Sequence, residues 1–118
     1  MKHSTGKPTK AEQLRLDRIH ALPCLACEME KVRQPLQTEA HHLVDKGTRL
    51  LSGGHMATIP LCKWHHRGER VEHLSSREMH VHYGPSLALH KREFKACYGT
   101  ERELLALTDE RLKQDEAA

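Results

Sequence analysis

The chain has 118 residues, a formal net charge of +3, and an apolar fraction of only 37% with four aromatic side chains. This length predicts a single domain, whose thin core would be stabilised by a bound metal. No apolar run reaches the roughly 18 residues that a membrane span needs, and residues 1–8 lack the apolar segment of a secretory signal. These features exclude a membrane protein and lead us to expect a cytoplasmic location.

The N-terminal residues predict a flexible basic arm over residues 1–8, followed by a helix. Thr9 and Glu12 have the spacing of a capping box, in which each side chain bonds the backbone of the other residue. Pro23 cannot continue a helix, so we expect the helix to end at about Leu22. The face directed at the core is expected to carry Leu14, Arg18, Ile19 and Leu22.

Two short chelating pairs predict a structural zinc site. Two residues separate Cys24 from Cys27, and two separate Cys62 from His65. This spacer lets both side chains of a pair reach one ion from a tight turn. Disulfide bonds are the alternative, but a chain without an export signal keeps its cysteines reduced. Cys97 stands apart from both pairs, and we interpret it as a buried free cysteine.

Between the two chelating pairs the sequence predicts a small hairpin. A strand over about residues 37–43 carries His41 and His42, and residues 58–61 form a second short strand. The connection, residues 45–54, contains three glycines but no phosphate-binding Gly-Lys-Ser/Thr motif. A helix is expected to follow the second strand directly.

The C-terminal part predicts three more helices. A capping box at Ser75 opens a short helix, another helix is expected to begin at Ser86, and a capping box at Thr100 opens the last one. Residues 115–118 are expected to form a disordered tail, so that the domain spans residues 9–114. The inner faces of the last two helices are expected to carry Leu87, Lys91, Phe94 and Tyr98, and Leu104, Leu105, Leu107 and Leu112. The fold class that follows is α+β and mainly helical.

The hairpin and the helix after it contain more metal-binding side chains than one zinc ion needs. The histidines left over are His41, His42, His55 and His66. Phosphodiester hydrolysis needs a deprotonated water, and a neutral histidine that titrates at about pH 6.5 can accept that proton. A divalent cation stabilises the charge of the transition state and of the leaving 3′ oxygen. The leftover histidines therefore indicate a second, hydrolytic site.

This arrangement resembles the metal-dependent nucleases of the HNH, or His-Me finger, family. The segments that carry the resemblance are Glu39-Ala40-His41-His42-Leu43 and Leu61-Cys62-x-x-His65-His66. The resemblance implies a ββα-metal core beside the zinc knuckle, with His42 as the general base. It also implies that His41 and His66 bind a catalytic divalent cation, Mg²⁺ or Mn²⁺.

One position departs from the HNH pattern. In that family an asparagine braces the base histidine, but this chain contains no asparagine. His55, which directly follows the glycine-rich connection, is the best substitute. It could hold His42 through a ring nitrogen or help to bind the metal, so we count it among the candidate catalytic residues.

The order of the motifs resembles more closely the phage recombination-enhancement (Ref) nucleases, which cut DNA in a RecA-dependent manner. The resemblance covers about residues 14–105 and includes Gly-His-x-x-Thr-Ile-Pro-Leu-Cys, Trp-His-His-Arg-Gly-Glu and Tyr-Gly-Pro-Ser-Leu-Ala. It implies DNA as the substrate, a RecA filament on DNA as a partner, and a phage or prophage gene acting in a bacterial host cell.

The distribution of charge suits a polyanionic partner. Residues 61–100 contain seven Lys/Arg against four acids, whereas residues 101–118 contain six acids against three bases. Arg67 and Arg70 follow the histidines on the same helix and are our candidates for contacts with DNA phosphates. The alternative for both arginines is a solvated helix face.

A second function remains open at this point. A catalytically inactive, zinc-stabilised DNA-binding module would use the same four zinc ligands. Such a module would have no need for His41, His42 or His66, so these surplus histidines favour the nuclease.

Overall fold

The computed structural model describes residues 6–117, so residue 118 and residues 1–5, most of the predicted arm, lie outside the described residues. The elements in chain order are α1 (Lys10–Ala21), α2 (Leu25–Glu30), β1 (Thr38–His42), the 3-10 turn η1 (Gly54–Met56), β2 (Thr58–Cys62), α3 (Lys63–Arg67), α4 (Ser76–Tyr83), α5 (Lys91–Tyr98) and α6 (Glu101–Ala117). The predicted hairpin and the helix directly after it are confirmed. The fold is α+β and mainly helical, as expected.

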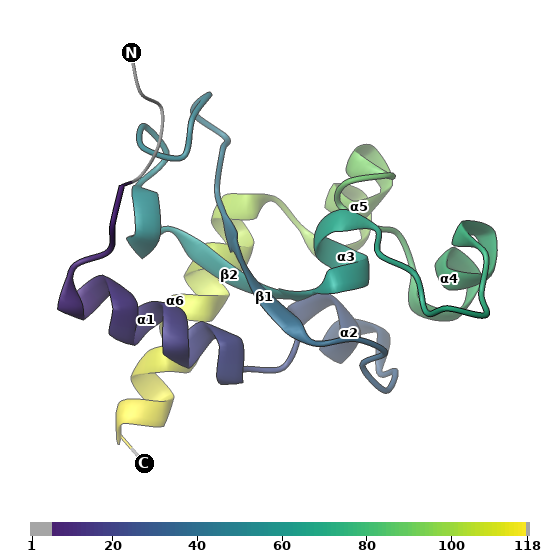
Figure 1. The fold of residues 1–118 in the computed structure, drawn as a ribbon, viewed down its shortest axis with the longest axis horizontal. Helices are drawn as coiled ribbons and strands as arrows, with labels where there is room; N and C mark the ends of the chain where they lie inside the picture. Colours follow the sequence, from purple (N-terminus) through teal and green to yellow (C-terminus); the bar gives the residue numbers. More distant parts are fainter. Residues whose placement is uncertain (1–5, 118) are drawn as a thin grey trace.

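The two-stranded antiparallel sheet lies in the middle of the molecule (Figure 1). Thr38 pairs with Cys62 and His42 pairs with Thr58, so the connection between the strands begins beside the two histidines of β1. Helices α1 and α6 pack along the hairpin, whereas α2 and α3 gather at the end where Cys62 lies (Figure 1). Helices from both ends of the chain therefore pack against the hairpin.

Two apolar clusters form the core. The larger cluster surrounds the hairpin, which is buried along the whole of β2, and it includes the three cysteines of the chelating pairs. Trp64 and Phe94 are its largest fully buried side chains. The smaller cluster joins α1 to α6 through Ile19, Leu22 and Leu112. Because the apolar area buried by so small a core is limited, a metal at the cysteines would add substantially to its stability.

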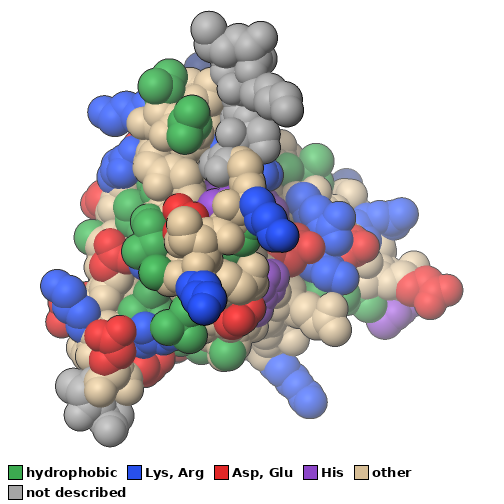
Figure 2. Space-filling view, turned by 60° about the vertical axis from the view of Figure 1, so that its left-hand side comes forward, with side chains coloured by type: hydrophobic (Ala, Val, Ile, Leu, Met, Phe, Trp, Pro, Cys, Tyr) green, Lys and Arg blue, Asp and Glu red, His purple; other side chains and the backbone are tan. Residues whose placement is uncertain are grey.

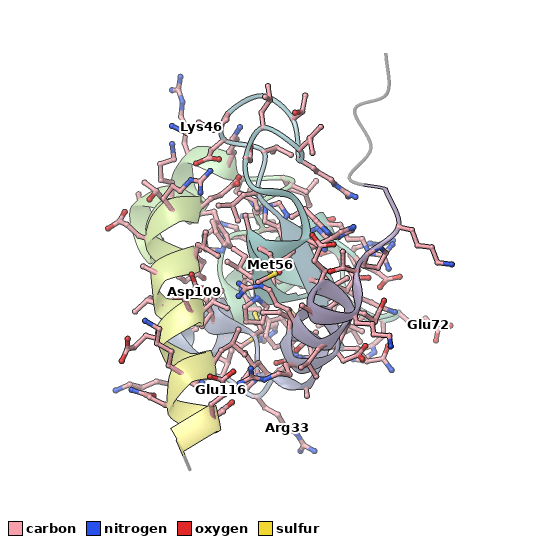
Figure 3. All side chains as sticks on the ribbon, turned by 90° about the vertical axis from the view of Figure 1, so that its left-hand side faces the viewer. Arg33, Lys46, Met56, Glu72, Asp109 and Glu116 are labelled. Carbon is pink, nitrogen blue, oxygen red and sulfur yellow. The ribbon has the colours of Figure 1, made fainter. Side chains whose placement is uncertain are left out.

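Helix α1 begins with the predicted capping box at Thr9, but its inner face differs from the prediction. Leu14 is 60% exposed, and Arg15 is buried in its place. The Arg15 guanidinium donates to the side chain and the carbonyl of Thr58, at 3.0 and 2.8 Å, and pairs with Asp109 at 2.9 Å. Asp109 lies on the side of α6 that faces the hairpin (Figure 3). This polar contact ties α1, β2 and α6 together, and apolar periodicity could not predict it.

Helix α5 begins at Lys91 rather than at the predicted Ser86. Residues 86–90 form one turn, closed by a 2.7 Å bond from the His90 amide to the Ser86 carbonyl. The turn is not continued, because His90 has φ −135° and ψ 55°, outside the helical region. The Leu87 amide donates to the His65 carbonyl at 2.8 Å, which holds this turn against α3. The predicted core residues of the helix proper, Phe94 and Tyr98, are buried.

Helix α6 begins with the predicted capping contacts of Thr100 and continues to Ala117. It thus passes residue 115, where we expected a disordered tail to start. An ion pair between Arg18 and Glu116, at 2.8 Å, holds the end of the helix against α1. Its buried side chains are Leu104, Thr108 and Leu112, while Leu107 is exposed. None of the helices within residues 6–117 is long and apolar enough to cross a membrane.

Gly84 links α4 to the turn before α5 at a crowded position. Its φ of +89° favours glycine, and a Cβ there would collide with the Tyr98 hydroxyl. Gly84→Ala is therefore expected to lower the free energy of unfolding by about 1–3 kcal/mol, measured by urea denaturation. Gly47→Ala is the matched control, since Gly47 has φ +107° but open space around a Cβ. If both variants lost the same free energy of unfolding, the collision with the Tyr98 hydroxyl would make no contribution.

Candidate active site and zinc centre

Four ligand atoms meet between α2 and α3. The sulfurs of Cys24, Cys27 and Cys62 and a ring nitrogen of His65 all lie within 4.8 Å of one another, and all four side chains are buried. His65 Nδ1 lies 3.3–3.5 Å from the three sulfurs, and Cys27 Sγ lies 3.9 Å from Cys62 Sγ. A tetrahedral zinc ion, with bonds of about 2.3 Å to sulfur and about 2.0 Å to nitrogen, separates its ligands by about 3.5–3.8 Å. The predicted ligand set therefore fits a structural zinc ion.

Both chelating pairs use the same local structure. Cys24 is the N-cap of α2 and accepts from the Cys27 amide, and Cys62 is the N-cap of α3 and accepts from the His65 amide, each at 3.5 Å. The free N–H groups and the dipole of a helix N-terminus stabilise a thiolate. His65 donates its Nε2–H to the Tyr83 carbonyl at 2.7 Å, which leaves Nδ1 directed at the sulfurs with its lone pair.

The leftover histidines form two pairs beside the hairpin. His41 and His42 are neighbours in β1 and point to opposite sides, as adjacent strand residues do. His41 faces His66, with ring centroids 5.0 Å apart, and His42 faces His55, with centroids 5.1 Å apart. His66 lies next to His65, a predicted zinc ligand, but outside the cluster of four ligand atoms.

Glu39 orients the ring of His66. Its Oε1 atom accepts a hydrogen bond from His66 Nδ1 at 2.9 Å and lies 3.1 Å from Arg67 Nε. With Nδ1 as the donor, His66 Nε2 keeps its lone pair. Burial lowers the pKa of His66 below its usual value, against the opposing influence of Glu39. His66 thus presents a neutral imidazole nitrogen, the form that binds metals.

His41 has a buried ring nitrogen without a hydrogen bond. Within residues 6–117, nothing donates to or accepts from His41 Nε2. The Glu101 carboxylate lies 3.6 Å from this nitrogen, too far for a hydrogen bond, and accepts instead from the Val44 amide at 3.1 Å. A buried nitrogen that lacks a hydrogen-bond partner and faces both a carboxylate and a second histidine fits a metal ligand.

A chain of hydrogen bonds fixes the ring of His42. His42 Nε2 lies 2.9 Å from His55 Nδ1, and His55 Nε2 lies 2.9 Å from the Gly6 carbonyl oxygen. A carbonyl can only accept, so His55 donates its Nε2–H to Gly6. With both rings neutral, His55 Nδ1 then accepts from His42 Nε2–H, and His42 Nδ1 is left with a lone pair. His55 thus contacts His42 through a ring nitrogen, which is the geometry that the first of its two expected roles requires.

Burial and nearby positive charge keep His42 neutral. Burial is the largest cause that lowers its pKa, to about 4, and the charge of Arg49 is the next. The pKa of about 6.5 that we used for the sequence is therefore too high for this position. At neutral pH the lone pair of His42 Nδ1 is free to accept a proton.

The two arginines predicted to contact DNA are already paired. Arg67 forms ion pairs with Glu39 at 3.1 Å and with Glu69 at 3.6 Å. Arg70 donates to the Leu74 carbonyl at 3.0 Å. Both side chains remain at the surface, so a phosphate could reach them only by exchanging with these partners.

Several residues around the site were not among our predictions. Glu39 could have been found, because residues two apart in a strand share a face and Glu39 lies two positions before His41. Nothing near Glu101 or Arg49 in the sequence indicated that they approach these histidines. Cys97 is exposed rather than buried, since it lies on the outer side of α5, and the prediction for it was wrong.

Residues 8–113 match the model of the protein family described as recombination enhancement, RecA-dependent nuclease. The match includes the cluster of three cysteines and His65 and both histidine pairs. It confirms the resemblance to that family seen in the order of the motifs. The chain belongs to the recombination enhancement, RecA-dependent nuclease family.

Proposed function

We propose that this nuclease is a metal-dependent DNA endonuclease of the HNH type. In the reaction a water oxygen attacks phosphorus, the bond from phosphorus to the 3′ oxygen breaks, and the 3′ oxygen leaves. The chain of hydrogen bonds from His42 through His55 to Gly6 supports this proposal most strongly. It gives one half-buried histidine a nitrogen with a free lone pair, close enough to His41 and His66 for their charges to help lower its pKa.

His42 is the general base of the proposed reaction. Its Nδ1 atom accepts the proton of the attacking water, while the Nε2–H bond to His55 keeps the ring in place. A pKa of about 4 makes the free imidazole a weak base. A DNA phosphate bound nearby would raise that pKa, because a neighbouring negative charge favours the protonated ring.

His41 and His66 are the proposed ligands of the catalytic cation. Their rings face each other, His41 Nε2 has no hydrogen bond among the described residues, and Glu39 leaves His66 Nε2 with its lone pair. A Mg²⁺ or Mn²⁺ ion bound there would supply positive charge to the transition state and to the leaving 3′ oxygen. Of the two ions, Mn²⁺ suits imidazole ligands better.

The role of Glu39 can be tested through the metal dependence. Glu39→Ala frees the His66 ring, and the concentration of Mn²⁺ that gives half-maximal cleavage is expected to rise about 10–100-fold. Glu69→Ala is the matched control, because Glu69 also pairs with Arg67 but does not contact His66. If both variants needed the same metal concentration as the wild type, Glu39 would have no part in metal binding.

DNA bound in a RecA filament is the proposed substrate. The family description names RecA dependence, and the basic residues near the site, including Arg67 and Arg70, would contact phosphates by exchanging their present partners. Because RecA filaments form on DNA in the bacterial cytoplasm, the protein would act there, as the product of a phage or prophage gene.

The direct test is cleavage of DNA with and without RecA filaments, in the presence and absence of Mg²⁺ or Mn²⁺. We expect cleavage that needs the divalent metal and that His42→Ala removes. DNA binding without cleavage in every one of these conditions would instead support the inactive, zinc-stabilised binding module.

A further inference from the structure

The connection between β1 and β2 exposes two adjacent large apolar side chains. We call residues 45–53 the tip loop. Leu50 is 58% exposed and Leu51 is 70% exposed, and both lie in this loop. The loop forms the end of the molecule above the hairpin in Figure 1, away from helices α2 and α4. Two neighbouring exposed leucines expose apolar area to water, which a binding partner could cover.

The tip loop is held in one conformation by hydrogen bonds. Arg102 of α6 donates to both carboxylate oxygens of Asp45, at 2.6 and 3.0 Å, and to the Ser52 carbonyl at 2.8 Å. The buried Ser52 hydroxyl donates to the Thr48 carbonyl at 2.6 Å and accepts from the Lys46 amide at 3.0 Å. The leucines are therefore presented by a braced loop, so little conformational entropy is lost when they bind a partner.

Positive charge flanks the two leucines. Lys46 and Arg49 are exposed, and their side chains form no hydrogen bond or ion pair with any residue in the described range 6–117. Figure 3 shows Lys46 at the outer edge of the molecule. At the top of Figure 2, hydrophobic side chains lie directly beside Lys or Arg side chains. This combination suits a partner that has negative charge around an apolar interior.

The tip loop is continuous with the candidate active site. It follows β1, which ends at His42, and it leads into η1, which carries His55. The Gly54 amide donates to the Arg49 carbonyl at 2.8 Å, so the backbone of Arg49 lies against the residue before His55. A polymer bound at the histidines would therefore pass close to the tip loop.

We propose that the tip loop is a wedge that inserts Leu50 and Leu51 between bases of the bound DNA, while Lys46 and Arg49 hold the flanking phosphates. Leucine side chains inserted at a base step separate the stacked bases and kink the duplex. Phosphate contacts from lysine and arginine fix the register of such a complex. The proposal rests on the DNA endonuclease function proposed above, and it adds how the strand is distorted beside the cleaved bond.

Binding to a duplex that is already unstacked tests the wedge. The probes are a fully paired duplex and the same duplex with one unpaired, bulged nucleotide, and the parent protein is His42→Ala, which does not consume them. Because the bulge removes part of the cost of separating stacked bases, the parent is expected to bind the bulged duplex about tenfold more tightly. Leu50→Ser with Leu51→Ser should abolish this preference.

A matched double variant controls for the loss of exposed apolar area. Val81→Ser with Leu107→Ser removes side chains that are 75% and 49% exposed on α4 and α6, away from the tip loop, and should keep the tenfold preference. Arg49→Ala should lower the slope of log Kd against log salt by about 1 on both probes, because one phosphate contact is lost. Unchanged zinc content would show that each variant is folded.

The outcomes separate the wedge from the nuclease proposal. If the wild type cleaves DNA but the parent binds both probes equally, or binds neither, the wedge is wrong and the nuclease stands. The wedge is also wrong if the leucine double variant keeps the preference. If that variant loses RecA-dependent cleavage but still prefers the bulged duplex, the leucines would instead contact a protein. If the wild type neither binds nor cleaves DNA with RecA and metal present, the nuclease proposal itself fails.

Discussion

Replacing Cys24 with serine is expected to remove the bound zinc and unfold the domain. A serine hydroxyl is a poor zinc ligand at neutral pH, and the three remaining ligands cannot complete a closed structural site. Zinc binding to such sites contributes about 10–16 kcal/mol to folding. That is as large as the whole stability of a typical domain, about 5–15 kcal/mol. The cysteines lie inside the larger apolar cluster, so their loss would open the core around β2.

The measurement is zinc content by metal analysis together with thermal unfolding. The wild type should hold one zinc ion per chain and unfold in one transition, and Cys24→Ser should hold none and show no cooperative transition. Cys97→Ser is the matched control, because Cys97 is exposed and outside the ligand cluster. It should change neither quantity. A wild type without zinc, or a Cys24→Ser protein with an unchanged melting temperature, would contradict the assignment.

The cluster of three cysteines and one histidine and the helix caps at Thr9 and Ser75 could be predicted because local spacing encodes them. Cys24 and Cys27 are near neighbours whose side chains must meet at a helix N-terminus. The capping boxes at Thr9 and Ser75 work in the same way, since each involves residues three apart. Each chelating pair and each cap depends only on residues within one turn of the chain, so the sequence was sufficient to predict them.

The contacts between distant residues could not be predicted. Arg15 was not among the residues predicted for the inner face of α1, because its partners Thr58 and Asp109 lie on two other elements. Glu101 approaches His41 only after α6 packs against the hairpin. The pKa of a group inside the fold depends on its burial and on every charge around it. The reference pKa of histidine is therefore higher than the pKa of His42 in the folded protein.

His42→Ala is expected to reduce DNA cleavage about 10²–10⁴-fold, the usual contribution of a general base. Fold and zinc content should be preserved, because His42 is only half-buried and lies outside the zinc ligands. Most of the DNA affinity should also survive, since basic residues rather than a neutral imidazole bind phosphates. His73→Ala is the control, because His73 is an exposed histidine away from the hairpin. Full activity in His42→Ala would move the catalytic role to another residue, with His55 as the first candidate.

The pH dependence distinguishes a buried base from an ordinary histidine. A group accepts a proton only above its pKa, and burial with the charge of Arg49 lowers the pKa of His42 to about 4. A histidine with the reference pKa of about 6.5 would make the cleavage rate climb between about pH 6 and 7. For His42 in this site we expect a rate that is nearly constant over that range and falls only as the pH approaches about 4. The free energy of unfolding should decline as the pH falls from about 6.5 to about 4, because over that interval the unfolded chain takes up a proton at His42 that the folded site refuses. A sharp rise in rate through the upper 6 range, present in the wild type and absent in the residual activity of His42→Ala, would show that the pKa of His42 is higher in the DNA complex than in the free protein, as the charge of a bound phosphate would make it.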